Sequence, residues 1–167
     1  MKKMGNDQRG MSLVELIIVI TMMAVLTATL TFGTGILTSK RVDSGAQQLL
    51  VSLQNARSHA LGKGNNAVRA VLKRDTDGNV MLEETINGTT KTVSIGRNDL
   101  TISYKLKGSD TEIILAETEE MVFHFDRSSG VLKPNADNTV YSAVMISKGS
   151  RKKVIEIEAV TGRISLK

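Results

Sequence analysis

Hydrophobic and polar positions divide the chain into three stretches with different patterns. After a polar start, residues 16–39 contain no charged side chain. From residue 42, apolar residues recur at steps of four and three, and from residue 67 they alternate with polar ones. These patterns predict an apolar helix, then an amphipathic helix, then a series of β-strands.

The uncharged stretch is long enough to cross a membrane. Residues 16–39 would rise about 36 Å as a helix, and a hydrocarbon core is roughly 30 Å thick. The preceding residues include Lys2, Lys3 and Arg9, and basic flanks stay on the cytoplasmic side. We therefore predict a single-pass protein of the inner, or cytoplasmic, membrane with an extracytoplasmic C-terminal part.

Glu15 lies directly before the uncharged stretch. An acidic side chain within a spanning segment costs about 2.5–3.5 kcal/mol at the bilayer centre and less near the interface, so it requires compensation. Cleavage after Gly10 would create an α-amino group on Met11, four residues from Glu15. That amine, together with the positive end of the helix dipole, would stabilise the carboxylate. The pair could close within one helix or between packed copies.

These residues resemble a known processing signal. A basic leader, Gly10, the segment Ser12-Leu13-Val14, Glu15 and an uninterrupted apolar helix are similar to the class III signal of type IV prepilins and pseudopilins. The resemblance implies that a prepilin peptidase cuts between Gly10 and Met11 and methylates the new N-terminus. It also implies that Glu15 serves assembly with other pilins or pseudopilins, driven indirectly by an assembly ATPase and a platform protein.

Two other N-terminal signals remain as alternatives. A cleaved secretory signal has an apolar core of roughly 7–15 residues, which is shorter than this run. An uncleaved anchor explains the length and the basic flank but gives no reason for Glu15. Two departures from the pilin pattern are Met11, where many pilins have phenylalanine, and Phe32, where many have a proline nearby.

The pattern predicts four segments. Residues 1–10 form a cytoplasmic leader, residues 11–37 the transmembrane and assembly half of a long helix, and residues 38–63 its amphipathic half. The apolar stripe of that second half is Val42, Ala46, Leu49, Leu53, Ala56 and Ala60, and a helix stop is expected near Gly62. Residues 64–167 form an extracytoplasmic β domain.

Period-two alternation and turn residues define the strands of the β domain. The predicted strands are 67–74, 80–86, 89–95, 100–107, 112–117, 121–126, 139–147, 154–160 and 163–167. Parallel strands would need crossover helices, and the pattern shows none, so we predict antiparallel pairing. The expected fold class is α+β and pilin-like, with a long N-terminal helix, membrane-spanning in its first half, packed on an antiparallel β-sheet domain.

The C-terminal part resembles one branch of the family. Val122-Phe123-His124-Phe125-Asp126, Ser129-Gly130 and Val160-Thr161-Gly162-Arg163-Ile164 are similar to the GspH/FimT minor pseudopilins and minor pilins. The function expected from the resemblance is a structural subunit of a type IV pilus or of a filament like that of type II secretion.

Composition argues against catalysis. The chain has no cysteine and two histidines, His59 and His124, with no zinc-type spacing and no nucleophile elbow. We predict no enzyme activity, no catalytic residue, no cofactor and no metal site. The segment 75–79 (Asp-Thr-Asp-Gly-Asn) has a metal-loop alternative, but an EF-hand needs its glycine at the sixth position, so a hairpin turn is favoured.

One basic cluster suggests an alternative function. Lys148, Arg151, Lys152 and Lys153 gather at a predicted hairpin tip, and Arg163 follows near the C-terminus. Such a cluster would give weak, salt-sensitive DNA binding. The alternative hypothesis is therefore a DNA-binding or ligand-binding pilin-like subunit of a competence apparatus for DNA uptake. The simpler interpretation of the cluster is a solvent-exposed hairpin turn with no ligand.

Overall fold

The computed structural model describes residues 12–62 and 68–167, without the side chains of residues 28–38. The chain divides into two compact units, Met1–Leu37 and Thr38–Lys167. The described residues contain one α-helix and nine β-strands. Helix α1, Leu13–Gly62, belongs to both units, and all strands belong to the second.

The second half of α1 carries the predicted apolar stripe. Each of its six residues is buried against the β domain: Val42, Ala46, Leu49, Leu53, Ala56 and Ala60. Gly45 lies beside this stripe, where a Cβ would stand 2.7 Å from the Ile95 carbonyl oxygen. Glycine at this position therefore lets the helix approach the strand backbone closely. The helix ends at Gly62, as predicted.

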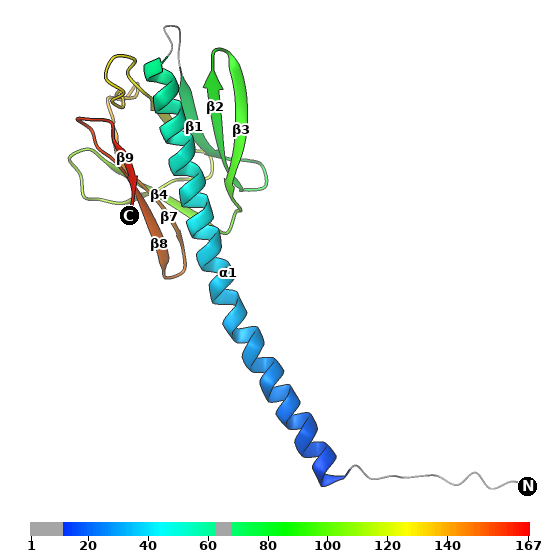
Figure 1. Cartoon of the computed structure of the whole chain (residues 1–167). Coiled ribbons are helices and arrows are strands. Elements are labelled where there is room, and N and C mark those ends of the chain that lie inside the picture. Colours follow the sequence, from blue (N-terminus) through cyan, green and yellow to red (C-terminus); the bar gives the residue numbers. More distant parts are fainter. Residues whose placement is uncertain (1–11, 63–67) are drawn as a thin grey trace, which may run out of the picture. The chain divides into compact units, whose positions relative to one another are not determined.

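Four strands form the first antiparallel sheet, in the order β3-β2-β1-β6. Their bounds are β1 Arg69–Arg74, β2 Val80–Ile86, β3 Thr89–Gly96 and β6 Met121–His124. Asn87 and Gly88 join β2 to β3 with φ angles of 53° and 80°, as a type I′ hairpin turn requires. The local meander of β1, β2 and β3 is visible in Figure 1.

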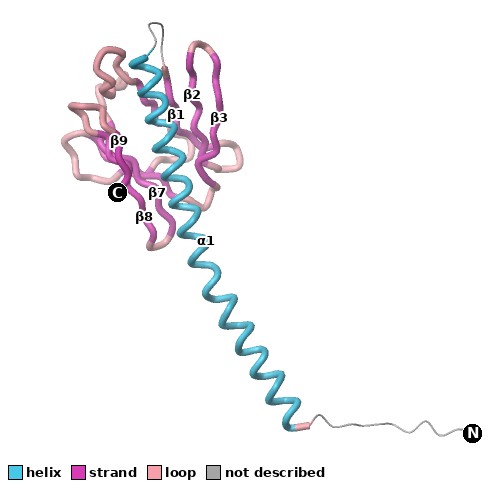
Figure 2. Tube along the Cα trace, viewed as in Figure 1, coloured by secondary structure: helices cyan, strands magenta, loops and turns pink. Residues whose placement is uncertain are grey.

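Five strands form the second antiparallel sheet, in the order β5-β4-β7-β8-β9. Their bounds are β4 Thr101–Leu106, β5 Ile113–Ile114, β7 Tyr141–Lys148, β8 Arg151–Ile157 and β9 Ile164–Leu166. Figure 2 shows the second half of α1 running over the strands of the domain, with loops gathered near the C-terminal end of the helix.

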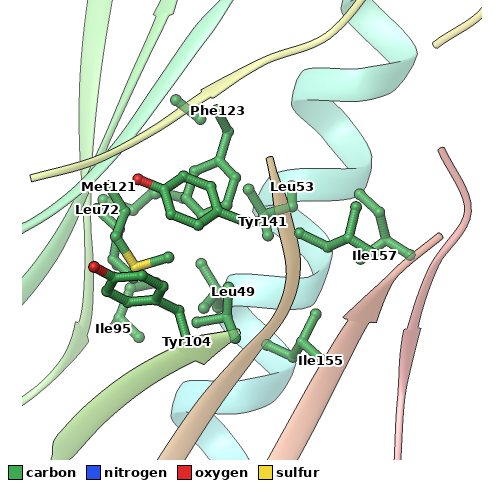
Figure 3. Packing of buried hydrophobic residues seen from close by; sticks show 14 of the residues in the cluster. Leu49, Leu53, Leu72, Ile95, Tyr104, Met121, Phe123, Tyr141, Ile155 and Ile157 are labelled. Carbon is green, nitrogen blue, oxygen red and sulfur yellow. The ribbon is translucent and has the colours of Figure 1, made fainter. Parts of the chain in front are cut away.

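The core lies between the second half of α1 and the inner faces of both sheets. Its aromatic centre combines Tyr104 and Tyr141, edge to face at 5.4 Å, with Phe123, which is 5.3 Å from Tyr141. Leu49 and Leu53 of α1 lie beside these rings (Figure 3). Because the buried apolar side chains among the described residues fall between positions 42 and 164, the second unit contains its own core.

The α+β class and antiparallel pairing are confirmed. A strand occurs within or overlapping every predicted range, although β5 covers two residues where six were expected, and β8 begins three residues earlier than predicted. The strands of this antiparallel domain separate into two sheets, because β1 pairs with β6 and β4 with β7.

Candidate functional site

Glu15 is the acidic residue in the first turn of α1. The helix begins at Leu13, and the Leu16 amide donates to the Ser12 carbonyl at 3.1 Å. Glu15 is exposed, so its carboxylate is accessible to a cationic partner at the positive end of the helix dipole. The predicted cleavage residues, Gly10 and Met11, lie outside the described residues.

The part of α1 that belongs to the first unit exposes large apolar side chains between Leu13 and Leu26. The exposed large apolar residues here are Leu13, Val14, Leu16, Ile17, Ile18, Val19, Ile20, Met22, Met23, Val25 and Leu26. Apolar surface of this extent marks a contact with lipid or with another protein. This segment therefore has the chemistry of an assembly or membrane-contact surface.

Thr21 and Thr27 bond within the helix. The Thr21 hydroxyl donates to the Ile17 carbonyl at 2.7 Å, and the Thr27 hydroxyl donates to the Met23 carbonyl at 2.6 Å. Such back-bonding gives the hydroxyl an acceptor within its own helix. Both threonines are therefore compatible with an apolar environment.

Within the described part of the chain, no helix combines the length and the hydropathy of a membrane span. The predicted span, residues 11–37, includes residues whose side chains lie outside that part, and it stays a prediction.

Residues 5–31 match the family model of the prokaryotic N-terminal methylation motif. The matched range includes Gly10, Met11 and Glu15, which are the three residues of the predicted processing and assembly site. The match supports a type IV pilin-like protein. In this family the motif implies processing by a prepilin peptidase, anchoring in the membrane and assembly with other pilins. No curated protein and no solved structure matches the chain.

Acidic side chains from distant segments hold the cations of the predicted DNA-contact hairpin. Lys148 forms an ion pair with Asp99. The same Asp99 carboxylate accepts a hydrogen bond from Arg41 Nη1 at 2.7 Å. Arg151 pairs with Asp43 of α1 at 3.3 Å. These ion pairs connect α1 to the hairpin of β7 and β8 through the carboxylates of Asp99 and Asp43.

Lys152 has a partner on the other face of the hairpin. It pairs with Glu112, whose second oxygen accepts a hydrogen bond from the Ser103 hydroxyl at 2.5 Å. The ammonium of Lys152, followed by the Ser103 hydroxyl, lowers the pKa of Glu112. Lys148, with Arg41 as the weaker contributor, lowers the pKa of Asp99. Both carboxylates therefore stay ionised and neutralise the cations beside them.

The other two candidate DNA contacts are placed differently. Lys153 lies on β8 and is half-buried, and Arg163 is exposed directly before β9. Arg163 borders two open hollows of about 670 and 610 Å³. The five candidate residues therefore do not form one continuous cationic surface.

A junction at the end of α1 was not predicted from the sequence. Arg57 donates from Nε to the Gly130 carbonyl at 3.0 Å and from Nη2 to the Thr161 carbonyl at 2.9 Å. A Cβ on Gly162 would stand 2.0 Å from the Gly130 carbonyl oxygen. The turns at Gly130 and Gly162 therefore lie in contact, and Arg57 donates a hydrogen bond to each of them. Ser129-Gly130 and Thr161-Gly162 indicated two turns in the sequence, but a local turn signal does not predict that the two turns touch.

The segment 75–79 is a closed hairpin turn. Asp75 Oδ1 accepts the amides of Asp77 at 2.9 Å and Asn79 at 2.8 Å. Asp75 Oδ2 accepts the Asn79 side-chain amide at 3.1 Å, and this bond is the main cause of the lowered pKa of Asp75. Among the described residues, no group of three or more His, Asp or Glu side chains is arranged to hold a metal ion.

Proposed function

We propose that the chain is a minor pilin or pseudopilin, a structural subunit of a type IV pilus or of a filament like that of type II secretion. The observation that carries the proposal is the methylation motif at residues 5–31, with Glu15 in the first turn of an exposed apolar helix. The β domain has its own core, so the first unit is available for contacts with lipid and with sister helices.

In this proposal, cleavage between Gly10 and Met11 gives the Met11 amine, and Glu15 neutralises it when subunits pack. The helix crosses the membrane once and leaves the β domain outside the cytoplasm. The energy for assembly comes from partner proteins, an ATPase acting through a platform protein. The resemblance of residues 122–126 and 160–164 to the GspH/FimT branch supports a minor rather than a major subunit.

The cleavage step is tested by Gly10→Ala in the native cell. Mass spectrometry of wild-type protein should show an N-terminus at a methylated Met11, and the variant should retain residues 1–10. Ser12→Ala, which changes a residue near the cleaved bond but not the glycine, serves as the matched control and should be processed. A wild-type chain that still begins at Met1 would refute the proposal.

The assembly step is tested by Glu15→Gln and Glu15→Leu. Both remove the negative charge, and the glutamine nearly preserves the shape of the side chain. We expect normal cleavage but loss of the protein from sheared or isolated filaments. Incorporation at the wild-type level would show that assembly requires no charge pair at this position.

The competence hypothesis receives less support from the geometry. Three of its five residues, Lys148, Arg151 and Lys152, already have carboxylate partners. A polyanion would have to break these pairs before it could bind. DNA retention that falls in a Lys152→Gln variant would restore this hypothesis for the hairpin.

A further inference from the structure

The second sheet has two edge strands that run in the same direction. In the order β5-β4-β7-β8-β9, β5 pairs only with β4 and β9 only with β8. Each of the four pairings is antiparallel, so strand direction alternates four times between the two edges and returns to where it began. The β5 edge of one copy can therefore join the β9 edge of another in parallel, without either copy being turned over.

β5 is an exposed apolar edge. The Leu115 amide donates to the Ile102 carbonyl at 2.9 Å, and successive residues of a strand direct their backbone groups to opposite sides. The amide and carbonyl of Ile114 therefore point away from β4. The side chain of Ile114 is 67% exposed and that of Ile113 36%. Edge strands are commonly protected by charged side chains or proline, and the two residues of β5 provide neither.

The edge of β9 lies at an open hollow of about 670 Å³ between this strand and α1. Lys167 exchanges backbone hydrogen bonds of 3.3 and 2.8 Å with Val154 of β8. By the same alternation, the amide and carbonyl of Leu166 point away from β8. Gln54 of α1 donates to the Ile164 carbonyl at 3.2 Å, but among the described residues none bonds to the backbone of Leu166 from this side. The hollow thus contains unpaired strand backbone.

One apolar row crosses the whole sheet on the face toward α1. The strand registers align five residues in this order: Ile113, Tyr104, Val144, Ile155 and Leu166. The middle three are buried in the core. At one end Ile113 is partly exposed, and at the other end Leu166 lines the hollow together with Leu50 and Leu61 of α1. An apolar side chain at one edge thus matches an apolar hollow at the other.

The two edges also differ in charge. Residues 108–126, which include β5, contain six acidic residues and no lysine or arginine. Four of the six pair with lysines of other segments, while Glu117 and Glu119 have no cationic partner in the part of the chain that the structure describes. Arg57 and Arg163 line the hollow at β9, and neither forms an ion pair with a described residue. Contact between unlike edges is therefore favoured over contact between like edges.

We propose that β5 of one copy pairs in parallel with β9 of a second copy, with Ile113 opposite Leu166. In this register the Leu166 amide donates to the Glu112 carbonyl, and the Ile114 amide donates to the Leu166 carbonyl, as a parallel ladder requires. The side chain of Ile113 enters the hollow between α1 and β9. The apolar row of one copy then continues into the next.

This contact is heterologous, because each copy uses β5 toward one neighbour and β9 toward another. Every added copy leaves one free edge of each kind, so the contact extends into a helical filament unless its rotation closes a ring. The inference rests on the proposed function for its setting, a filament of packed subunits. The surfaces themselves belong to the β domain.

Disulfide cross-linking between two single-cysteine variants tests the contact on the full-length protein in nonionic micelles. The chain has no cysteine, and the proposed register places Ile114 opposite Lys167. Neighbouring strands lie about 4.8 Å apart, which is within the Cα separation of a disulfide. Ile114→Cys and Lys167→Cys, purified separately and mixed under mild oxidation, should form a mixed dimer. Both replaced side chains are exposed, so the domain should keep its fold.

Thr92→Cys is the matched control for Ile114→Cys. Thr92 is exposed on β3, the edge strand of the first sheet, and this variant should not cross-link to Lys167→Cys. A mixture without the disulfide, or an equal yield with the Thr92→Cys control, would overturn the proposal. A dimer formed equally well by Ile114→Cys alone would show that like edges meet, which contradicts the heterologous contact.

Filling the hollow gives a second test. Ser58 is exposed on α1 and lines the hollow, so Ser58→Trp in the Lys167→Cys chain should lower the cross-link yield several-fold. Asn55→Trp, at an exposed position of α1 that does not line the hollow, should leave the yield unchanged. Equal yields from both would place the contact elsewhere. The cross-link does not require cleavage after Gly10, so failure of this contact and failure of the proposed function are distinguishable.

Discussion

Replacing Gly162 with alanine should cause a large loss of stability in the β domain. Gly162 has a φ of 67°, and an added Cβ would stand 2.0 Å from the Gly130 oxygen and 2.7 Å from the Gly130 carbonyl carbon. Both neighbours are backbone atoms, so one of the two turns has to move. Movement of Gly130 or Thr161 would also disturb the two hydrogen bonds from Arg57.

The expected magnitude follows from these two effects. A left-handed conformation costs alanine about 1–2 kcal/mol, and a hydrogen bond to a charged group contributes about 1.5–3 kcal/mol. With at least one Arg57 bond lost, Gly162→Ala should reduce the free energy of unfolding by about 3–5 kcal/mol. Gly149→Ala is the matched control: Gly149 has a φ of 58°, but no atom lies within 4 Å of the added Cβ. It should lose only about 1–2 kcal/mol.

Urea unfolding of the full-length protein in nonionic micelles measures both values. The two tyrosines, Tyr104 and Tyr141, lie in one core, so near-UV circular dichroism reports its loss. Equal destabilisation by Gly162→Ala and Gly149→Ala would refute the rigid contact between the turns. A double-mutant cycle adds a check, because Arg57→Met should have a much smaller effect in the Gly162→Ala background than in the wild type.

Three further variants test other contacts by the same unfolding assay or by titration. Gly45→Ala should destabilise the domain, although alanine favours a helix by about 1 kcal/mol over glycine. The reason is that the added Cβ would stand 2.7 Å from the Ile95 carbonyl oxygen. A more stable variant would contradict the close contact between α1 and the backbone at Ile95. Burial of Tyr104, and to a lesser extent its hydrogen bond to Glu119, raises the pKa of its hydroxyl to about 12. The contribution of Tyr104 to the free energy of unfolding is therefore fully present below pH about 10 and declines as the pH rises through about 12. Tyr104→Phe should remove this decline. Hydrogen bonds, the strongest from the Ser128 hydroxyl, lower the pKa of Asp126. The contribution of Asp126 to the free energy of unfolding is therefore present above the ordinary pKa of an aspartate and is lost as the pH falls. Asp126→Asn should lower the urea midpoint at neutral pH and make that midpoint less dependent on acid pH.

Local patterns carried most of the element assignments. The stripe from Val42 to Ala60 and the alternation in β1, β2 and β3 depend on neighbours in sequence, so period and turn chemistry were sufficient. The division into two sheets depends on β1 pairing with β6 and β4 with β7. Those pairs join segments separated by several turns, and no periodicity within a segment specifies its distant partner.

The site shows the same limit. Gly10, Met11 and Glu15 form a local signal, and a family model covers them. The hairpin cations formed an equally compact cluster in the sequence, but their partners come from α1, the segment after β3 and the segment before β5. Asp43, Asp99 and Glu112 could not be assigned to those lysines and arginines before the strands were placed. Sequence proximity therefore overstated the positive charge available at this hairpin.

The two ends of the domain half of α1 are attached by different chemistry. Near its start, Arg41 and Asp43 use ion pairs, and near its end Arg57 uses two backbone carbonyls, with the buried stripe between them. A force along the helix axis would pull α1 parallel to the surface of the domain, so the ion pairs, the buried stripe and the Arg57 hydrogen bonds would resist it at the same time. Raising the ionic strength should weaken mainly the attachment near Arg41, so the mechanical strength of a subunit pulled through its helix should depend only modestly on salt.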